Sequence, residues 1–187
     1  MKIDDNQLTQ LQRLIAGGSQ KAFEDLYRLF FGRLFNFAIL YVHKKEVAEE
    51  LVNDVMIRVW RRRDELAGIR NLETYLFVAV RNHSLNYLSR YSPYYVAVES
   101  ENAQGQLIDV NDPGRELEWK EIWFRLNQAI DELPDQCRTV FKLIKEEGFK
   151  YKQVAEILNI SPRTVETQLF RAIKKLDKVI EKSFFRL

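Results

Sequence analysis

The 187-residue chain has few residues that could form covalent or metal sites: one cysteine, Cys137, and two histidines, His43 and His83. A single cysteine excludes a disulfide within the chain, which fits a reducing compartment, and we expect a cytoplasmic protein. The histidines lie far apart in sequence, and no Cys/His cluster has metal-ligand spacing. We therefore expect no metal.

Long apolar runs are also missing. The richest one, residues 30–42, is interrupted by Arg33 and is too short to cross a bilayer. The N-terminus lacks the basic-then-apolar pattern of a signal peptide. The sequence therefore predicts no membrane insertion.

Catalytic motifs are absent as well. The sequence has no phosphate-binding glycine loop and no G-x-S-x-G. Cys137 lies on the inward stripe of an expected helix, where a thiol is usually inert packing. The sequence therefore predicts no enzyme, no catalytic residue, no cofactor and no small-molecule substrate.

The composition is otherwise that of an ordinary globular protein, with 30% charged and 46% apolar residues and a net charge of only +2. Strand-like alternation is nowhere sustained, with only seven glycines and four prolines. The stretch after Ser92-Pro93 is acidic and aperiodic. We expect an all-α protein of two small helical domains, 1–92 and 116–187, joined by a flexible linker over 93–115.

Four helices are predicted in the first domain, and most have clear end signals. Gly17-Gly18 ends the first helix, Ser19 caps the second and Asn71 caps the fourth after a loop from Gly68. The third is acidic in its first half and basic at its end, as the helix macrodipole favours. The expected ranges are Asp4–Ile15, about 20–42, Lys44–Glu65 and Leu72 to about Tyr91.

The fourth helix combines aromatic side chains with Arg and Asn, a composition used to stack unpaired bases. Its inward face is expected to carry Leu72, Leu76, Ala79, Val80, Leu85 and Leu88. Its outward face is expected to carry Tyr75, Phe77, Arg81, Asn82, His83, Asn86, Tyr87 and Arg90. An equally supported interpretation is that Tyr75, Phe77 and Tyr87 pack against the preceding helices.

The second domain is predicted to begin with helices at Glu116–Ile130 and Asp135–Glu146, separated by Leu133-Pro134 and ended by Gly148. The residues expected inside the second of these helices are Cys137, Val140, Phe141 and Ile144. Two further helices follow directly, so this domain is expected to be a compact bundle.

The stretch 149–176 is predicted to form two helices joined by a tight turn. One apolar face is formed by Tyr151, Val154, Ala155, Ile157 and Leu158. Ser161-Pro162 is a helix start signal. A second apolar stripe is formed by Val165, Leu169, Ala172, Ile173, Leu176 and Ile180.

This arrangement matches the helix-turn-helix, whose second helix enters the DNA major groove. Residues 148–187 hold nine basic and four acidic residues, a plausible phosphate-facing charge of +5. By side-chain chemistry, Glu166 and Gln168 suit base reading, and Arg171, Lys174 and Lys175 suit phosphate contacts, while Thr167 is not assigned to either. The alternative for this stretch alone is an αα-hairpin with a solvated charged face.

In this order, the motifs resemble those of the extracytoplasmic-function (group four) sigma factors of bacterial RNA polymerase. The residues that carry the resemblance are Lys21-Ala22-Phe23 to Tyr27, 48–55 with Val59-Trp60, Thr74-Tyr75-Leu76, Asn82, Asn86-Tyr87-Leu88, Leu133-Pro134, 151–157 and 161–165. They span nearly the whole chain. The sequence departs from some members at Glu166 and Gln168, where those carry arginine, which affects the promoter sequence read.

The resemblance implies that the first domain, like sigma region two, docks on the clamp helices of the polymerase β′ subunit. The residues it implicates are Glu50, Asn53, Asp54, Arg58 and Trp60. It also implies that the fourth helix and the preceding loop recognise and open the −10 promoter element. The residues implicated there are Arg70, Asn71, Tyr75, Arg81, Asn82, His83 and Asn86.

The second domain, like sigma region four, would read the −35 element and contact the β flap. The residues implicated in −35 recognition are Ser161, Arg163, Thr164, Glu166, Thr167, Gln168, Arg171, Lys174 and Lys175. A linker of about 25 residues at up to ~3.3 Å each reaches on the order of 80 Å, enough to hold two promoter elements. By resemblance, the implied partners are core RNA polymerase, promoter DNA and an anti-sigma factor.

Two other functions compete with this interpretation. A response-regulator-type activator also ends in a helix-turn-helix, but it needs a receiver domain of alternating strands and helices, and no such pattern is visible. A helical adaptor of the polymerase that binds only protein would tolerate loss of Arg171, Lys174 and Lys175, whereas a sigma factor would not.

Overall fold

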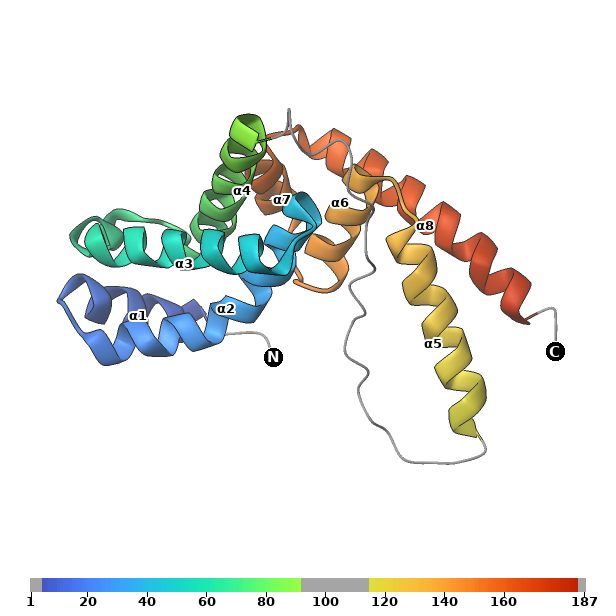
Figure 1. Cartoon of the computed structure of the whole chain (residues 1–187), viewed down its shortest axis with the longest axis horizontal. Coiled ribbons are helices and arrows are strands. Elements are labelled where there is room, and N and C mark those ends of the chain that lie inside the picture. Colours follow the sequence, from blue (N-terminus) through green and yellow to red (C-terminus); the bar gives the residue numbers. More distant parts are fainter. Residues whose placement is uncertain (1–4, 92–114, 185–187) are drawn as a thin grey trace. The chain divides into compact units, whose positions relative to one another are not determined.

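The computed structural model describes residues 5–91 and 115–184, with side chains described for 6–91 and 123–178. Regular structure in these ranges is entirely helical (Figure 1), which confirms the all-α class. The elements are α1 (Asp5–Ala16), α2 (Gln20–Val42), α3 (Lys45–Arg61), the 3-10 helix η1 (Arg63–Gly68), α4 (Leu72–Tyr91), α5 (Arg115–Asp131), α6 (Asp135–Lys145), α7 (Tyr151–Leu158) and α8 (Pro162–Phe184). The expected linker 93–115 lies outside the described residues except for Arg115, where α5 begins.

The chain divides into two compact helical units, and the expectation of two small helical domains is confirmed at this level. Of the described residues, one unit contains 5–91 together with 152–160, and the other contains 115–151 together with 161–184. The first therefore holds α1 to α4 and nearly all of α7, and the second holds α5, α6 and α8.

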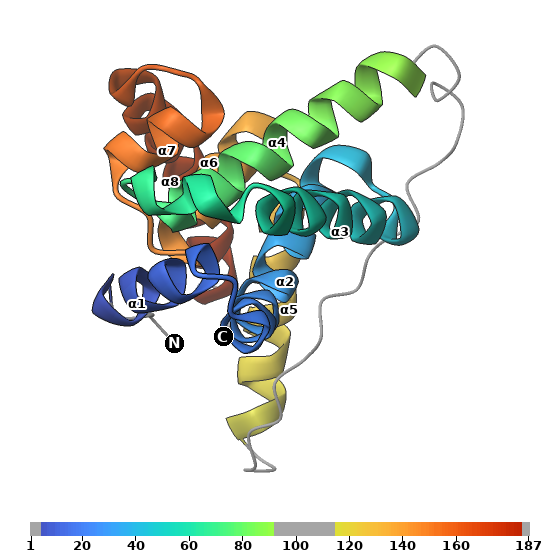
Figure 2. The same cartoon turned by 90° about the vertical axis from the view of Figure 1, so that its left-hand side faces the viewer.

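In the first unit, α2 packs against α3 and α4, and α1 packs against α2 and η1 (Figure 2). The predicted caps are present: Ser19 Oγ accepts from Ala22 N at 3.3 Å, and Asn71 Oδ1 accepts from Thr74 N at 2.8 Å. Leu26, Phe30 and Leu34 of α2 are fully buried. Each such side chain contributes about 1.5–3 kcal/mol, so the aromatic density of α2 mainly stabilises the core.

The third helix ends earlier than predicted. The sequence predicts one helix from Lys44 to Glu65, but α3 ends at Arg61 and η1 follows. Arg62, with φ −106° and ψ 29°, breaks the helical path, and the tighter turn buries Leu66, which is 1% exposed. Since η1 packs against α1, contacts distant in sequence outweigh the local helix propensity.

Two side chains of α4 lie on the side opposite to that predicted. Phe77, expected outside, is fully buried with its ring centroid 5.1 Å from that of Phe37. Leu85, expected inside, is 37% exposed. Both errors arise because α4 is apolar on more than one side, so that periodicity alone does not select the buried face. Packing against α2 is therefore the correct interpretation for Phe77, while Tyr75 and Tyr87 are half-buried.

In the second unit, α8 packs against both α5 and α6. The core cluster consists of Ala129, Ile130, Leu133, Cys137, Ala172 and Leu176, with Leu126 and Phe141 against it. The predicted helices 116–130 and 135–146 are confirmed as α5 and α6. Leu143, which was not among the expected core residues, is 1% exposed, whereas Ile144 is half-buried.

The predicted order of short helix, tight turn and longer helix is present. At the end of α7, Ile160 N donates to Ala155 O at 3.0 Å and Asn159 takes the left-handed conformation with φ 51°, as in a Schellman motif. Ser161 Oγ then accepts from Thr164 N at 3.0 Å, so the predicted cap of α8 is confirmed. Tyr151, expected on the apolar face of α7, is instead 42% exposed. The side chain of Ile180 lies outside the described residues.

Candidate nucleic-acid interface

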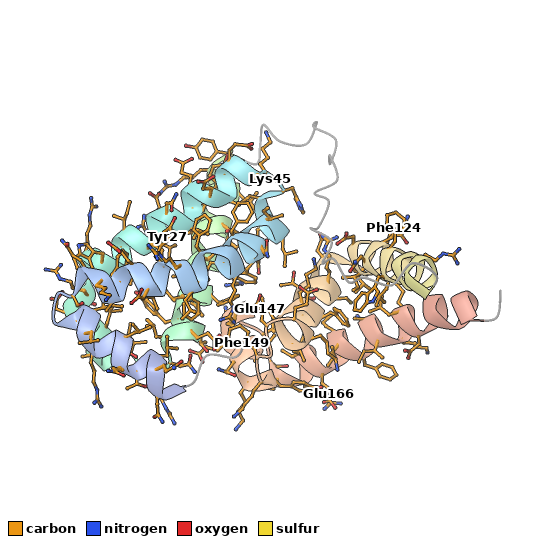
Figure 3. All side chains as sticks on the ribbon, turned by 90° about the horizontal axis from the view of Figure 1, so that it is seen from below. Tyr27, Lys45, Phe124, Glu147, Phe149 and Glu166 are labelled. Carbon is orange, nitrogen blue, oxygen red and sulfur yellow. The ribbon has the colours of Figure 1, made fainter. Side chains whose placement is uncertain are left out.

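α8 separates an apolar face from a polar one. Its buried residues are Val165, Leu169, Ala172 and Leu176. Its exposed residues include nearly all of those assigned to DNA from the sequence: Arg163, Glu166, Thr167, Arg171, Lys174 and Lys175, with Ser161 exposed at the cap and Thr164 half-buried. Glu166 points away from the helix (Figure 3). The unit thus presents a helix of groove-entering size with donors, acceptors and cations outward.

Gln168 is turned toward α6 rather than outward. Its Nε2 donates to Gln136 Oε1 at 2.9 Å, and its Oε1 accepts from Cys137 Sγ at 3.0 Å. Burial raises the pKa of the Cys137 thiol, while Arg171 and Lys175 act in the opposite direction. Because its pKa is raised, the Cys137 thiol stays protonated and can donate this hydrogen bond to Gln168. The Gln168 amide therefore fixes the contact between α6 and α8, a position that does not favour base reading.

Lys175 also bonds within its own unit. Its Nζ donates to the carbonyl of Glu132 at 2.7 Å, just after α5 ends. Cations at a helix C-terminus satisfy otherwise orphaned carbonyls. Arg171 and Lys174 are exposed on α8 and are the better placed of the three predicted phosphate contacts.

Phe170 was not assigned a role from the sequence, yet it lies on the polar face of α8 with 65% of its surface exposed. It follows Glu166 by one helical turn and precedes Arg171. An apolar side chain on a helix that lies in the major groove can contact the methyl group of thymine. The signal available in the sequence was its position out of phase with the apolar stripe.

A second polar surface lies in the first unit, where α3 and α4 enclose a hollow of about 190 Å³. Four of the residues predicted to open the −10 element meet here, Tyr75, Asn82, His83 and Asn86, together with Val55, Arg58, Val59, Arg62 and Ala79. An aromatic ring, two amides and two guanidinium groups around one hollow suit a nucleotide base and its phosphate.

His83 is one of the residues that line this hollow. Its Nε2 is buried, has no hydrogen-bond partner within the described residues, and lies 3.8 Å from Asp54 Oδ2, beyond normal hydrogen-bond length. Arg81, another predicted residue, is half-buried and donates to Asn82 Oδ1 at 3.2 Å. Asn82 and His83 thus line the same hollow, and Arg81 is bonded to Asn82.

The segment 62–71 before α4 carries the remaining predicted −10 residues. Arg70 is exposed, while Asn71 is exposed but uses its side chain to cap α4. Arg62 donates to Glu65 through Nε at 2.9 Å, and the Arg63 guanidinium lies 4.9 Å from the centroid of the Trp60 ring. The charged side chains at the start of this segment are therefore held by interactions with neighbouring residues.

The residues implicated in polymerase docking lie along α3, but their environments differ. Glu50, Asp54 and Arg58 are exposed. Asn53 Oδ1 accepts from the hydroxyl of Tyr27 on α2, the residue labelled in Figure 3, at 2.8 Å. The ring centroid of Trp60 lies 5.1 Å from that of Phe23. Asn53 and Trp60 therefore also join α3 to α2.

In the part of the chain that the structure describes, no group of three or more His, Cys, Asp or Glu residues is arranged to bind a metal ion. No helix within the same residues has the length and apolar character needed to span a bilayer.

Comparison with known families decides between the interpretations. Residues 18–93 match Sigma-70 region 2, and residues 123–176 match Sigma-70 region 4. The two matches occur in the expected order and together cover more than half of the chain. The chain is an RNA polymerase sigma factor of the extracytoplasmic-function group. The competing functions, a response-regulator-type activator and a protein-only adaptor, are not favoured.

Relatives of this sigma factor align over nearly its full length. It is 26% identical over 179 residues to the RNA polymerase sigma-H factor of Pseudomonas aeruginosa, covering 92% of this chain and 93% of that protein. It is 27% identical over 171 residues to the ECF RNA polymerase sigma-E factor of Escherichia coli, covering 88% and 89%.

The fold of this sigma factor also resembles a solved structure. The sigma factor RpoE of Bartonella quintana, in complex with the anti-sigma factor NepR, matches with a TM-score of 0.64 and 22% identity, over 86% of this chain and 98% of that chain. This likeness supports the two-domain helical fold.

Proposed function

We propose that this sigma factor directs initiation from promoters with two separate elements, with one element read by each domain. Residues 1–92 dock on core polymerase and recognise and open the −10 element, residues 116–187 read the −35 duplex, and 93–115 link them. The observation that carries the proposal is the outward face of α8, which combines base-reading and phosphate-binding side chains over a buried apolar stripe.

The −35 assignment follows from the chemistry of that face. Glu166 can accept a hydrogen bond from the amino group of cytosine, and Phe170 offers an apolar surface to a thymine methyl group. Arg163, Arg171 and Lys174 are exposed cations suited to phosphates on either side. Because Gln168 and Lys175 are bonded to α6 and to the end of α5, we assign them to positioning.

The −10 assignment rests on the α3–α4 hollow and on the segment 62–71. Strand opening requires a surface that replaces the stacking and pairing that a base loses in the duplex. Tyr75, Asn82, His83 and Asn86 line one hollow, and exposed Arg70 and Asn71 precede it in the chain. Arg81 supports Asn82. This geometry suits a strand held along α4.

Polymerase docking is assigned to α3, where Glu50, Asp54 and Arg58 are exposed, while Asn53 and Trp60 are held by α2. The clamp helices of β′ and the flap of β are the expected contacts. A cytoplasmic anti-sigma interaction is proposed from RpoE, which was solved in complex with NepR. The chain has no catalytic activity of its own in this scheme and acts in the cytoplasm.

Run-off transcription tests the proposal. Purified core polymerase is assayed with and without the protein on a genomic fragment library, and enriched start sites are aligned. We expect two conserved elements, dependence on the protein, and loss of transcription with R163A/R171A while core binding is retained. The control K145A changes an exposed lysine on α6. Starts without a shared upstream element, or full activity of R163A/R171A, would overturn the −35 assignment.

A further inference from the structure

Gln12 is a buried polar residue on α1 whose partners lie far along the chain. It is 8% exposed, and its Nε2 donates to the carbonyls of Leu66 at 2.5 Å and Ile69 at 2.7 Å. These residues are 54 and 57 positions later. Both hydrogens of the amide are therefore used, which offsets the cost of burying it.

The two carbonyls belong to the turn that ends η1. Ile69 N donates back to Leu66 O at 2.9 Å, so Gln12 completes a closed set of bonds around this turn. The next residue is exposed Arg70, followed by Asn71, whose side chain caps α4 at 2.8 Å. The buried side of the turn is thus bonded to Gln12 of α1, while Arg70 and Asn71 on its outward side are exposed to solvent.

Packing alone does not explain a glutamine at this position. Leu8 and Ile15 of α1 are already buried, at 8% and 0% exposure. An apolar residue between them would fill the space without the desolvation cost of an amide. What an apolar residue cannot do is fix two carbonyl oxygens of a specific turn.

We infer that Gln12 is a positioning residue for −10 recognition, which holds the backbone of segment 62–71 in the arrangement that presents Arg70 and Asn71 to DNA. The inference rests on the proposed function of this segment. Recognition groups must be held within about 0.5 Å of their productive positions by supporting bonds, so loss of the two bonds from Gln12 should weaken recognition at this segment.

The test uses the full-length protein with core polymerase and a promoter obtained from the fragment library. Q12M keeps the size of the side chain and removes both donors. The matched control Q10M makes the same change at an exposed glutamine of α1. Run-off yields are compared on the parent promoter and on single-base variants of the −10 and of the −35 elements, well below the melting temperature of each protein.

We expect Q12M to lose roughly fivefold or more of its discrimination among −10 variants, corresponding to about 1 kcal/mol. Its discrimination among −35 variants and its binding to core polymerase should match those of Q10M and the wild type. Unchanged −10 discrimination by folded Q12M would overturn the inference, as would an equal loss at both elements.

Failure of the inference is distinguishable from failure of the proposed function. If the wild type does not discriminate among −10 variants, or if R70A leaves that discrimination intact, the −10 assignment of the segment is itself wrong. If Q12M does not fold, as judged by circular dichroism, Q12N decides by the same comparison, because it retains the donors but shortens their reach. Wild-type discrimination by Q12N would then overturn the inference.

Discussion

Phe170 exposes 65% of its surface to solvent on the polar face of α8. Its contribution to the fold is therefore small, and its contribution to a complex depends on what covers it. The major groove offers the methyl group of thymine as an apolar partner at an otherwise polar surface. Residues of this kind separate stability from function, because they can be removed without disturbing the core.

F170A is expected to weaken binding to a −35 duplex by about 1 kcal/mol, roughly fivefold, because a methyl contact is lost. Its melting temperature should be unchanged, as for most surface substitutions. Fluorescence anisotropy with duplexes measures the affinity. F124A is the matched control, since Phe124 is 66% exposed on α5.

Replacing thymine by uracil in the −35 element refines this measurement, because uracil lacks only the methyl group. The replacement should weaken binding by the wild type but not by F170A. Equal losses for both proteins would show that Phe170 does not contact the methyl.

The buried hydroxyl of Tyr41 makes the stability of the protein depend on pH. Burial raises the pKa of its hydroxyl from 10.0 to about 12, although Arg81 opposes the shift. Above pH 10 the unfolded chain loses this proton while the folded protein retains it, so stability is present below pH 10 and is lost as the pH rises toward 12. Urea unfolding between pH 9 and 11 should show a steeper loss of stability for the wild type than for Y41F. Parallel curves would contradict this assignment.

The starts of α2, α4 and α8 could be predicted from the sequence because their signals are local. Ser19, Asn71 and Ser161 each accept the expected backbone bond within three residues. The end of α3 was not predictable in the same way. It depends on the burial of Leu66 and on its bond from Gln12, 54 residues earlier, and no periodic pattern contains that information.

Which face of a helix is buried also depends in part on contacts that are distant in sequence. The stripe of α8 was predicted because apolar and polar residues separate at the helical period. For α4, the sequence wrongly predicted that Phe77 is exposed and Leu85 is buried, since both are apolar and only packing against α2 distinguishes them. The position of Gln168 depended on its two partners on α6, which the sequence does not reveal.

The outward face of α8 predicts how DNA binding responds to salt. Each phosphate contact adds about 0.9 to the slope of log affinity against log salt concentration. R171A/K174A should therefore reduce the slope by about 2 and weaken binding to all sequences alike. Anisotropy titrations at several salt concentrations measure the slope, with K145A as the control. A normal slope accompanied by altered sequence preference would indicate base contacts instead.

Two recognition modules on one chain act together only if the segment between them can span the distance between their sites. The contribution of the second module then depends on its effective concentration at its own element. The segment 93–115 is expected from the sequence to be the linker, and its length sets this reach.

Deleting residues 98–109 should shorten the maximal reach by roughly 40 Å. We expect at least about a tenfold loss of transcription from promoters with both elements, with core binding unchanged. Run-off yield and a core-binding titration measure the two effects. Replacing the same residues by Gly and Ser is the control and should preserve activity. Activity retained after the deletion would show that reach does not limit initiation.

The short 3-10 segment has a practical consequence. Because Gln12 of α1 holds the end of η1, the exposed residues of segment 62–71, among them Arg70 and Asn71, form a small cassette on a turn that is bonded to the core. Such a cassette could be exchanged between related proteins without redesigning their cores. Promoter preference would then be a transplantable property, and sets of mutually insulated regulators could be engineered from one scaffold.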